Sequence, residues 1–345
     1  MNPVMRRFAR HCLRPLAPVA ILALAGVGCT REAAPPPSRL PAAVGRLAFN
    51  APGLGQPFML EALALTLQPI PAGTFRMGSP FAEPGHTVLE SPQTWVTLTQ
   101  PFWLGRTEVT HAQWRAVMGA DLADQARKAF PAEANPARLL AGTADDVPVY
   151  FVTWREAMEF CARLTERARA EGWLPAGHAF TLPTEAQWEY ACRAGSLEAT
   201  YEGPLTMRGE NHAPELDAIA WYAGNSSVGY RGRGWDTADW PEKQYPGGLA
   251  GVRSVAQKRA NAWGLHDMLG NVYEWCRDHP TPALPGNAAK DPTGASDGID
   301  RSVRGGSWHS SPVFCRAAHR AWNNPDGRSQ FIGFRVALAP VPTDR

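Results

Sequence analysis

The sequence predicts an α+β fold that is rich in loops, with short strands and a few helices. Gly and Pro each occur 32 times among 345 residues, which favours many turns over long regular elements. Thirteen Trp and a hydrophobic fraction of 44% indicate a substantial core. Short strand-like runs alternate with a few helical patterns and long loops, an order typical of α+β and not of parallel α/β proteins.

Residues 1–28 have the pattern of a lipoprotein-type signal peptide, with an arginine-rich start and an apolar run over residues 16–27. The run is too short to span a bilayer stably. Cys29 follows it and is the expected lipidated first residue of the mature chain. We therefore expect an exported protein of the cell envelope, lipid-anchored at a bacterial membrane. The alternative is ordinary cleavage that releases a free protein.

Residues 29–57 are predicted to form a Pro-rich tether, because the three consecutive prolines at 35–37 are stiff and their neighbours offer little to bury. The folded domain is expected over residues 58–345. Within it, short strand-like runs predict strands at residues 63–67, 73–79, 95–98, 102–105 and 149–153, and residues 95–98 also alternate between apolar and polar side chains.

Three threonines are expected to cap helices, since a Thr hydroxyl accepts hydrogen bonds from the first turn. Thr110 precedes a helix through residue 114, and Thr153 precedes one from 154 to about 171 with apolar residues at i, i+3, i+4 and i+7. Thr184 precedes a third helix, where Gln187 completes a capping box. Residues 195–260 are expected to be mostly loop.

Charge and motifs exclude several classes of function. The formal charge is +2, and removal of the four leader arginines leaves −2, so no basic footprint for nucleic acid remains. The sequence has no Gly-x-Ser-x-Gly elbow and no His-Glu-x-x-His motif. The nine His are scattered without the spacing of a non-haem iron triad. The Gly-rich residues 229–234 follow no clear strand and are not a phosphate loop.

Four separated blocks have a distinctive sequence: IPAGTFRMG at residues 70–78, LPTE and WEYA within 182–191, WGLHDMLGNVYEW at 263–275, and RGGSW through GFR within 304–335. Together and in this order, they resemble the formylglycine-generating enzyme (sulfatase-modifying factor) family. The resemblance covers about residues 68–338. It implies the formylglycine-generating-enzyme variant of the C-type lectin fold, with bound structural calcium.

The oxygenases of that family bind Cu(I) through two cysteines in the motif Gly-Gly-Ser-aromatic-x-Cys-x4-Cys. On this chain Trp308 is the aromatic residue, Ser310 stands at the first cysteine position, and Cys315 is the second cysteine. Cu(I) is soft and selects thiolates, so a serine hydroxyl is a poor replacement. Copper and a catalytic role for Cys315 are therefore expected only if the chain is an enzyme.

The resemblance also implies a calcium site in the motif that starts at Asp267. Asp267 and Glu274 would supply carboxylate oxygens, and Gly270 and Val272 would supply carbonyls, which are the hard ligands that calcium prefers. A second site would start at Asn225. The alternative is that these carboxylates are ordinary turn and surface groups.

The C-terminal segment predicts a binding face. Unlike side chains without helical or strand period stand between Arg, Gly and Pro residues, which suits display from loops on a rigid scaffold. The candidate ligand-binding residues are Trp308, His309, Ser310, Phe314, His319, Trp322, Asn324 and Phe331. The segment also resembles the variable segment of diversity-generating-retroelement proteins, although family members without any retroelement have similar sequences in this segment.

Four cysteines remain after Cys29: Cys161, Cys192, Cys276 and Cys315. An even number of cysteines in an exported protein suggests disulfides. Cys161 lies on an apolar helical face, so the alternative for this residue is a free thiol in the core. The resulting hypothesis is a binding or accessory lipoprotein that recognises an unknown protein or small molecule, with membrane contact through its lipid. The alternative is a copper-dependent formylglycine-generating oxidase or another divergent oxygenase of the family.

Overall fold

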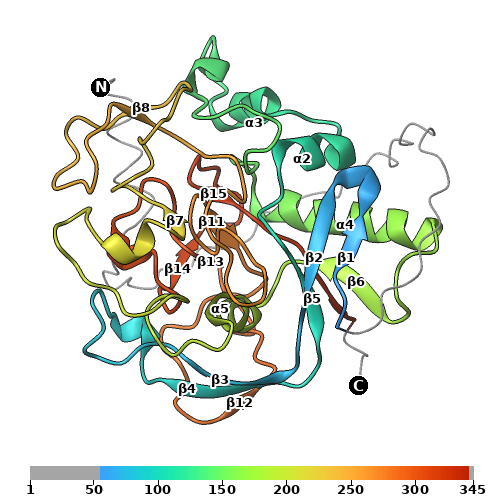
Figure 1. Ribbon diagram of the computed structural model, residues 1–345. Helices are drawn as coiled ribbons and strands as arrows, with labels where there is room; N and C mark the ends of the chain where they lie inside the picture. The colour runs from blue at the N-terminus through green and yellow to red at the C-terminus, as the bar shows by residue number, and fades with distance from the viewer. Residues whose placement is uncertain (1–54, 342–345) are drawn as a thin grey trace, which may run out of the picture. The chain divides into compact units, whose positions relative to one another are not determined.

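The computed structural model describes residues 55–341, where loops connect short strands and four α-helices (Figure 1). The expected signal peptide, Cys29 and nearly all of the tether lie outside these residues. The helices are α2 (His111–Met118), α3 (Leu122–Ala129), α4 (Trp154–Ala170) and α5 (Glu185–Arg193). Short 3₁₀ turns are η1 (Glu61–Leu63), η2 (Val88–Glu90), η3 (Pro136–Leu139), η4 (Pro214–Leu216) and η5 (Pro312–Phe314). Among the described residues, no helix is both long and apolar enough to cross a membrane.

The largest sheet is antiparallel and has the strand order β1-β2-β5-β16-β6. Its strands are β1 (Phe58–Leu60), β2 (Leu65–Ile70), β5 (Phe102–Gly105), β16 (Ala337–Pro340) and β6 (His178–Thr181). The last strand of the chain therefore lies between strands from its beginning and middle. Helix α4 packs along β6, and α2 packs on α4 (Figure 1).

The other sheets are smaller and mix parallel with antiparallel pairs. The four-stranded sheet contains β14 (Ala321–Asn323), β13 (Arg301–Arg304), β11 (Tyr273–Trp275) and β15 (Ile332–Gly333). A three-stranded sheet contains β12 (Ala289–Lys290), β4 (Thr94–Leu98) and β3 (Gly73–Met77). Two pairs are β10 (Leu269–Gly270) with β7 (Ala220–Trp221), and β8 (Trp235–Asp236) with β9 (Leu249–Ala250). The expected loop-rich α+β class is confirmed.

The predicted threonine caps are confirmed at all three helices. Thr110, Thr153 and Thr184 each accept a hydrogen bond from the backbone N–H three residues later, and the side chain at that later position accepts one from the threonine N–H. These reciprocal bonds satisfy donors that a helix cannot pair internally. On α4, Phe160 stacks on Trp114 with ring centroids 5.9 Å apart, so its apolar stripe faces the core.

One predicted strand is wrong, and one helix was not predicted. Residues 149–153 form no strand, because Phe151 has a φ of +58°, which breaks the extended backbone. Val149 still donates to the Val109 carbonyl at 2.9 Å, so the segment is buried without being regular. Helix α3 was not predicted, although Asp121 caps it with a full capping box.

The disulfide expectation is also wrong. Cys161, Cys192, Cys276 and Cys315 are all buried free thiols. Cys161 belongs to one hydrophobic cluster and the other three belong to a second, where each packs against apolar side chains. They behave as small core residues, the alternative raised for Cys161.

Buried arginines tie the C-terminal part to other segments. Each places its guanidinium on a glutamate that is itself buried. The pairs are Arg304 with Glu189, Arg316 with Glu90, Arg320 with Glu185 and Arg335 with Glu274. These arginines and glutamates therefore form a set of buried ion pairs inside the protein, which is called the buried ionic framework below, and they are not surface charges.

Asp278 is expected to make stability fall as pH rises through the weakly acidic range. Burial, and then the adjacent Glu185 carboxylate, raise the pKa of Asp278 to about 7. An acid with a raised folded pKa binds its proton more tightly in the folded state, so its favourable contribution is lost between about pH 4 and about pH 7. The Asp278→Asn substitution keeps an oxygen for the Glu185 N–H and removes the charge.

Chemical denaturation across this range tests that expectation. The wild-type free energy of unfolding should decline toward neutral pH by a few kcal/mol more than that of Asp278→Asn. Parallel pH profiles for the two proteins would contradict it.

Candidate functional site

Two consecutive glycines shape the segment that carries most of the predicted site. Gly305 and Gly306 follow β13 with φ values of +98° and +79°, which L-residues rarely adopt. A Cβ on Gly306 would lie 2.7 Å from the Cys315 sulfur. The Gly-Gly pair is therefore required for the turn that brings residue 307 next to Cys315.

Ser307 and Ser310 form a hydrogen-bonded hydroxyl pair at the position of the family's copper motif. The Ser307 N–H donates to Ser310 Oγ at 3.0 Å, and the two hydroxyl oxygens are 3.1 Å apart. Cys315 is fully buried beside them, and burial raises the pKa of its thiol to about 12 despite the nearby Ser307 N–H. At neutral pH this cysteine is a thiol and not a thiolate.

Tyr273 and His319 extend this polar cluster. The Tyr273 hydroxyl lies 3.4 Å from His319 Nε2, and burial raises the pKa of Tyr273, a rise that a hydrogen bond with Ser310 opposes. Burial, and then the Arg316 charge, lower the pKa of His319 to about 3, so the imidazole is neutral. The predicted residue Phe314 packs on it with ring centroids 5.1 Å apart. Of the predicted binding residues, Ser310, Phe314 and His319 therefore lie near one another, and Tyr273, which was not predicted, lies between Ser310 and His319.

A second part of the predicted face is an aromatic cluster, defined as Trp235, Trp240, Trp308, His309 and Phe331. Trp308 is fully buried and forms its floor, while the other rings are partly exposed. His309 lies 4.9 Å from Trp240, 5.2 Å from Trp235 and 4.8 Å from Phe331, measured between ring centroids. Burial lowers the pKa of His309 to about 4, so it is a neutral ring at physiological pH.

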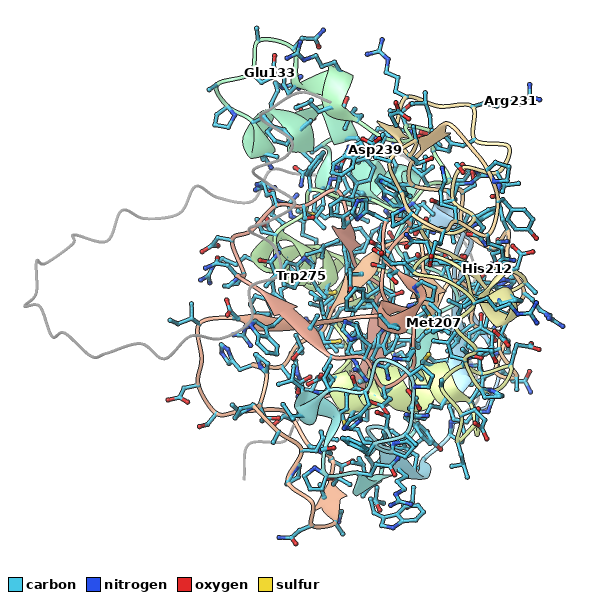
Figure 2. The ribbon with its side chains drawn as sticks, turned by 90° about the vertical axis from the view of Figure 1, so that its left-hand side faces the viewer. Glu133, Met207, His212, Arg231, Asp239 and Trp275 are labelled. Carbon is cyan, nitrogen blue, oxygen red and sulfur yellow. The ribbon has the colours of Figure 1, made fainter. Side chains whose placement is uncertain are left out.

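Trp235 and Trp240 lie within residues 195–260, which were expected to be mostly loop. Figure 2 shows the side chain of Arg231, which belongs to the same loop, pointing outward. By contrast, Trp275 of β11 lies in the interior, where its indole N–H donates to the Val152 carbonyl at 3.1 Å. In the sequence, the indication that this loop contributes to the aromatic cluster is the presence of two tryptophans in a stretch rich in Gly and charged residues.

The last two predicted binding residues lie elsewhere on the segment. Trp322 is on β14, paired with Ser302 of β13, and within residues 55–341 it has no ring contact with the aromatic cluster. Asn324 is exposed, and its side chain accepts from the Asp326 N–H at 2.9 Å in a local turn. The predicted face is therefore divided into separate groups.

The carboxylate of Asp267 interacts electrostatically with that of Glu108, a residue that the sequence did not indicate. Glu108, just before α2, is fully buried, and neither of its carboxylate oxygens has a hydrogen-bond partner among the described residues. Asp267 accepts from the Ala256 N–H at 2.6 Å through Oδ2, while Oδ1 is unpartnered. Burial raises the pKa of Asp267 to about 6, and burial together with the Asp267 charge raises that of Glu108.

Unsatisfied, buried carboxylate oxygens are costly unless a cation or proton compensates them. They are also the hard ligands that calcium requires, so this pair fits a calcium ion. Glu274 does not contribute in the expected way, because Arg335 holds both of its oxygens at 2.6 Å and Trp188 donates to one. No group of three or more His, Cys, Asp or Glu in the described part is arranged to hold a metal, so other ligands would be carbonyls or water.

Gly270 ends strand β10, and Val272 lies in the bend between β10 and β11. Gly270 has a φ of +80°, and a Cβ there would lie 2.2 Å from the Trp221 carbonyl oxygen, so glycine is required. The Asn225 side chain is committed to the local backbone: its oxygen accepts from the Tyr222 N–H at 3.0 Å and its nitrogen donates to Ala220 and Asp217. The structure thus gives Asn225 the role of a turn brace.

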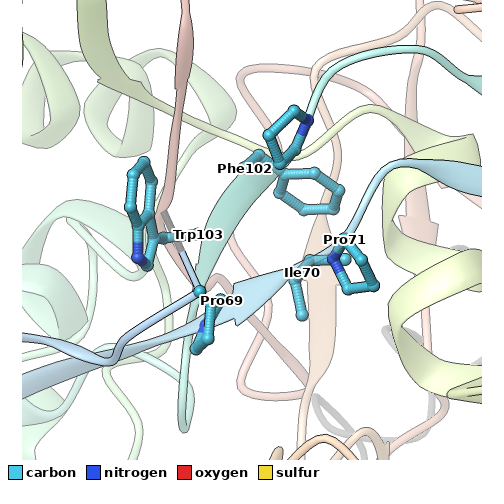
Figure 3. A pocket seen from close by; sticks show the side chains of 7 residues that line it. Pro69, Ile70, Pro71, Phe102 and Trp103 are labelled. Atoms are coloured by element: carbon cyan, nitrogen blue, oxygen red, sulfur yellow. The ribbon is translucent and has the colours of Figure 1, made fainter. Parts of the chain in front are cut away.

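A separate pocket of about 230 Å³ opens between the ends of β2 and β5 (Figure 3). It is lined by Gly55, Pro69, Ile70, Pro71, Pro101, Phe102 and Trp103. None of the predicted site residues lines it, and its walls carry no titratable group.

Comparison with known proteins agrees with this fold and motif pattern. Residues 65–340 match the family of the sulfatase-modifying factor enzyme 1-like domain. The formylglycine-generating enzyme of Bos taurus is 29% identical over 203 residues, 57% of this chain and 46% of that enzyme, so the chain spans less than half its length. The enzyme of Streptomyces coelicolor is 29% identical over 312 residues, 78% of this chain and 87% of its own. The chaperone protein LppX of Paenibacillus barcinonensis is 28% identical over 267 residues, 70% of this chain and 81% of its own.

Solved structures with the same fold include Treponema denticola variable protein 1 and PvdO from Pseudomonas aeruginosa. Each has a TM-score of 0.60 and 24% identity, and each is covered to 99%, with 83% and 84% of this chain matched respectively. These likenesses establish the fold alone. Because the family match covers most of the chain and contains all four predicted blocks, the chain belongs to the formylglycine-generating-enzyme family of sulfatase-modifying factor domains.

Proposed function

We propose that this chain is a binding or accessory lipoprotein of the cell envelope, and not a copper-dependent formylglycine-generating oxidase. The observation that carries the proposal is the hydrogen-bonded Ser307–Ser310 pair beside a buried Cys315 thiol. A linear Cu(I) site needs two thiolates, and here one ligand is a hard hydroxyl. The same fold supports many functions, so loss of this pair is compatible with a stable family member.

The proposed contact surface is the aromatic cluster. Its outer rings are partly exposed above the buried Trp308, and rigid aromatic side chains give large contact area at low entropic cost. The partner is a protein or a small molecule. A relative named as a chaperone supports an accessory role toward another protein. Lipid attachment at Cys29 would hold this surface at the membrane.

A photo-crosslinking amino acid at position 240 is expected to capture a discrete partner in the native cell envelope. The matched control is the same amino acid at Leu197, which is 73% exposed but lies outside the cluster. We expect a defined adduct from position 240 and none from position 197, with the first weakened by Phe331→Ala. Equal adducts at both positions, or none at position 240, would contradict the proposed surface.

We also propose that calcium is bound by Asp267 and Glu108. When bound, the ion would supply positive charge to the unpartnered oxygens of the two carboxylates and link the segment before α2 to the segment that carries Asp267. At a hundredfold excess over its dissociation constant, a ligand of the folded state stabilises it by about 2.7 kcal/mol. We therefore expect calcium to raise the melting temperature of the chelator-treated protein.

Two substitutions test whether these carboxylates are responsible. Glu108→Gln and Asp267→Asn should each abolish the calcium-dependent rise, whereas Glu159→Gln, on the exposed side of α4, should retain it. An undiminished calcium effect in Glu108→Gln would assign the ion to another site.

A further inference from the structure

The loop between β3 and β4 contains a continuous chain of hydrogen bonds that starts at a partly exposed serine. Ser91 Oγ lies 3.0 Å from His86 Nε2, and His86 Nδ1 lies 2.8 Å from Ser79 Oγ. Ser79 Oγ in turn donates to Glu90 Oε2 at 2.5 Å. Ser91 and His86 are half-buried, whereas Ser79 and Glu90 are buried.

The donors and acceptors of this chain determine its direction. Arg316 contacts both oxygens of Glu90 at 2.8 Å, so the carboxylate is ionised and only accepts. The single hydroxyl proton of Ser79 goes to Glu90, and the Ser79 oxygen is therefore left to accept from His86 Nδ1–H. In a neutral imidazole with its proton on Nδ1, Nε2 carries a lone pair, which accepts from the Ser91 hydroxyl.

We propose that Ser91 is a nucleophile and His86 its general base, in a site for esters with an apolar acyl group. The arrangement is that of an activated serine: a hydroxyl on a histidine whose other nitrogen is oriented by a third group. Ser79, backed by Glu90, is the positioning residue. This site is independent of the binding surface proposed above.

The reaction is an ordinary acyl transfer. The Ser91 proton passes to His86 Nε2 while Ser91 Oγ forms a bond to the ester carbonyl carbon. The carbon–oxygen bond to the alcohol then breaks, and the leaving oxygen takes the proton from His86. Water, deprotonated by the same nitrogen, releases the acyl group as a carboxylic acid and restores the serine.

The surroundings indicate the substrate class and the rigidity of the site. Phe81 and Val88, on the same loop, are 91% and 77% exposed and offer apolar contact beside the serine. The Phe81 ring lies 5.7 Å from the His86 ring. Arg316 donates to the Gly85 carbonyl at 2.6 Å, so the buried ionic framework anchors the segment that carries His86.

An alkyl fluorophosphonate, which labels activated serines, tests the site in the purified full chain. We expect phosphonylation of Ser91, found by peptide mass spectrometry and absent in Ser91→Ala. His86→Ala should slow labelling by about a hundredfold or more, and added imidazole should restore part of the rate. His86→Gln, which keeps hydrogen-bonding groups but no base, should be equally slow without rescue.

Ser254 is the matched control, since its hydroxyl donates to Asp146 at 2.9 Å without a histidine. It should remain unlabelled. Labelling of Ser91 no faster than that of Ser254, or an unchanged rate in both His86 variants with wild-type melting temperatures, would overturn the proposal.

Discussion

The Ser310→Cys substitution is expected to turn a chain with little affinity for Cu(I) into one that binds a single Cu(I) ion tightly. Ser310 and Cys315 share one neighbour, because the Ser307 N–H donates to Ser310 Oγ and also acts on the Cys315 sulfur. A second sulfur at position 310 would complete a soft pair of ligands, and metal binding would deprotonate both thiols. We expect an affinity gain of at least about three orders of magnitude.

Anaerobic titration against a chromogenic Cu(I) chelator measures this gain. Ser311→Cys, which adds a thiol one position away, should leave the affinity near that of the wild type. Adding Cys315→Ala to the Ser310→Cys variant should remove the gain. Tight one-to-one binding by the wild type, with oxygen consumption on a cysteine-containing peptide, would refute the accessory role and support the oxidase.

Arg335→Ala is expected to destabilise the fold by about 3–5 kcal/mol, because it leaves the Glu274 carboxylate buried without its cation. Arg335 is fully buried and meets both Glu274 oxygens at 2.6 Å, and it also donates to the Gly105 carbonyl at 2.8 Å. A loss of this size is a large fraction of the net free energy of unfolding of a typical domain. Guanidinium denaturation would measure it.

Two comparison variants separate charge burial from loss of packing. Arg335→Met combined with Glu274→Leu removes both charges and should recover a large part of the loss. Arg155→Ala, which breaks an exposed pair with Asp326, should change stability little. A similar loss in Arg155→Ala and Arg335→Ala would show that the buried pair has no special role.

Sequence alone determined those features that depend on neighbouring residues. Thr110, Thr153 and Thr184 cap helices because each cap is a bond to the residue three positions ahead, a relation visible in the sequence. The family blocks and the Ser310 substitution in the copper motif are likewise linear patterns. The expected fold class followed from these and from the abundance of Gly and Pro.

Only the tertiary structure decided which distant residues meet. The Glu108 carboxylate interacts electrostatically with that of Asp267, the rings of Trp235 and Trp240 pack on His309, and the four cysteines are buried free thiols. These contacts join residues separated by tens to more than a hundred positions, and no local period encodes them. These contacts form only when the chain folds and its sheets and buried ion pairs assemble. Burial then makes each unpaired charge or hydroxyl costly, which favours structures in which such groups have partners.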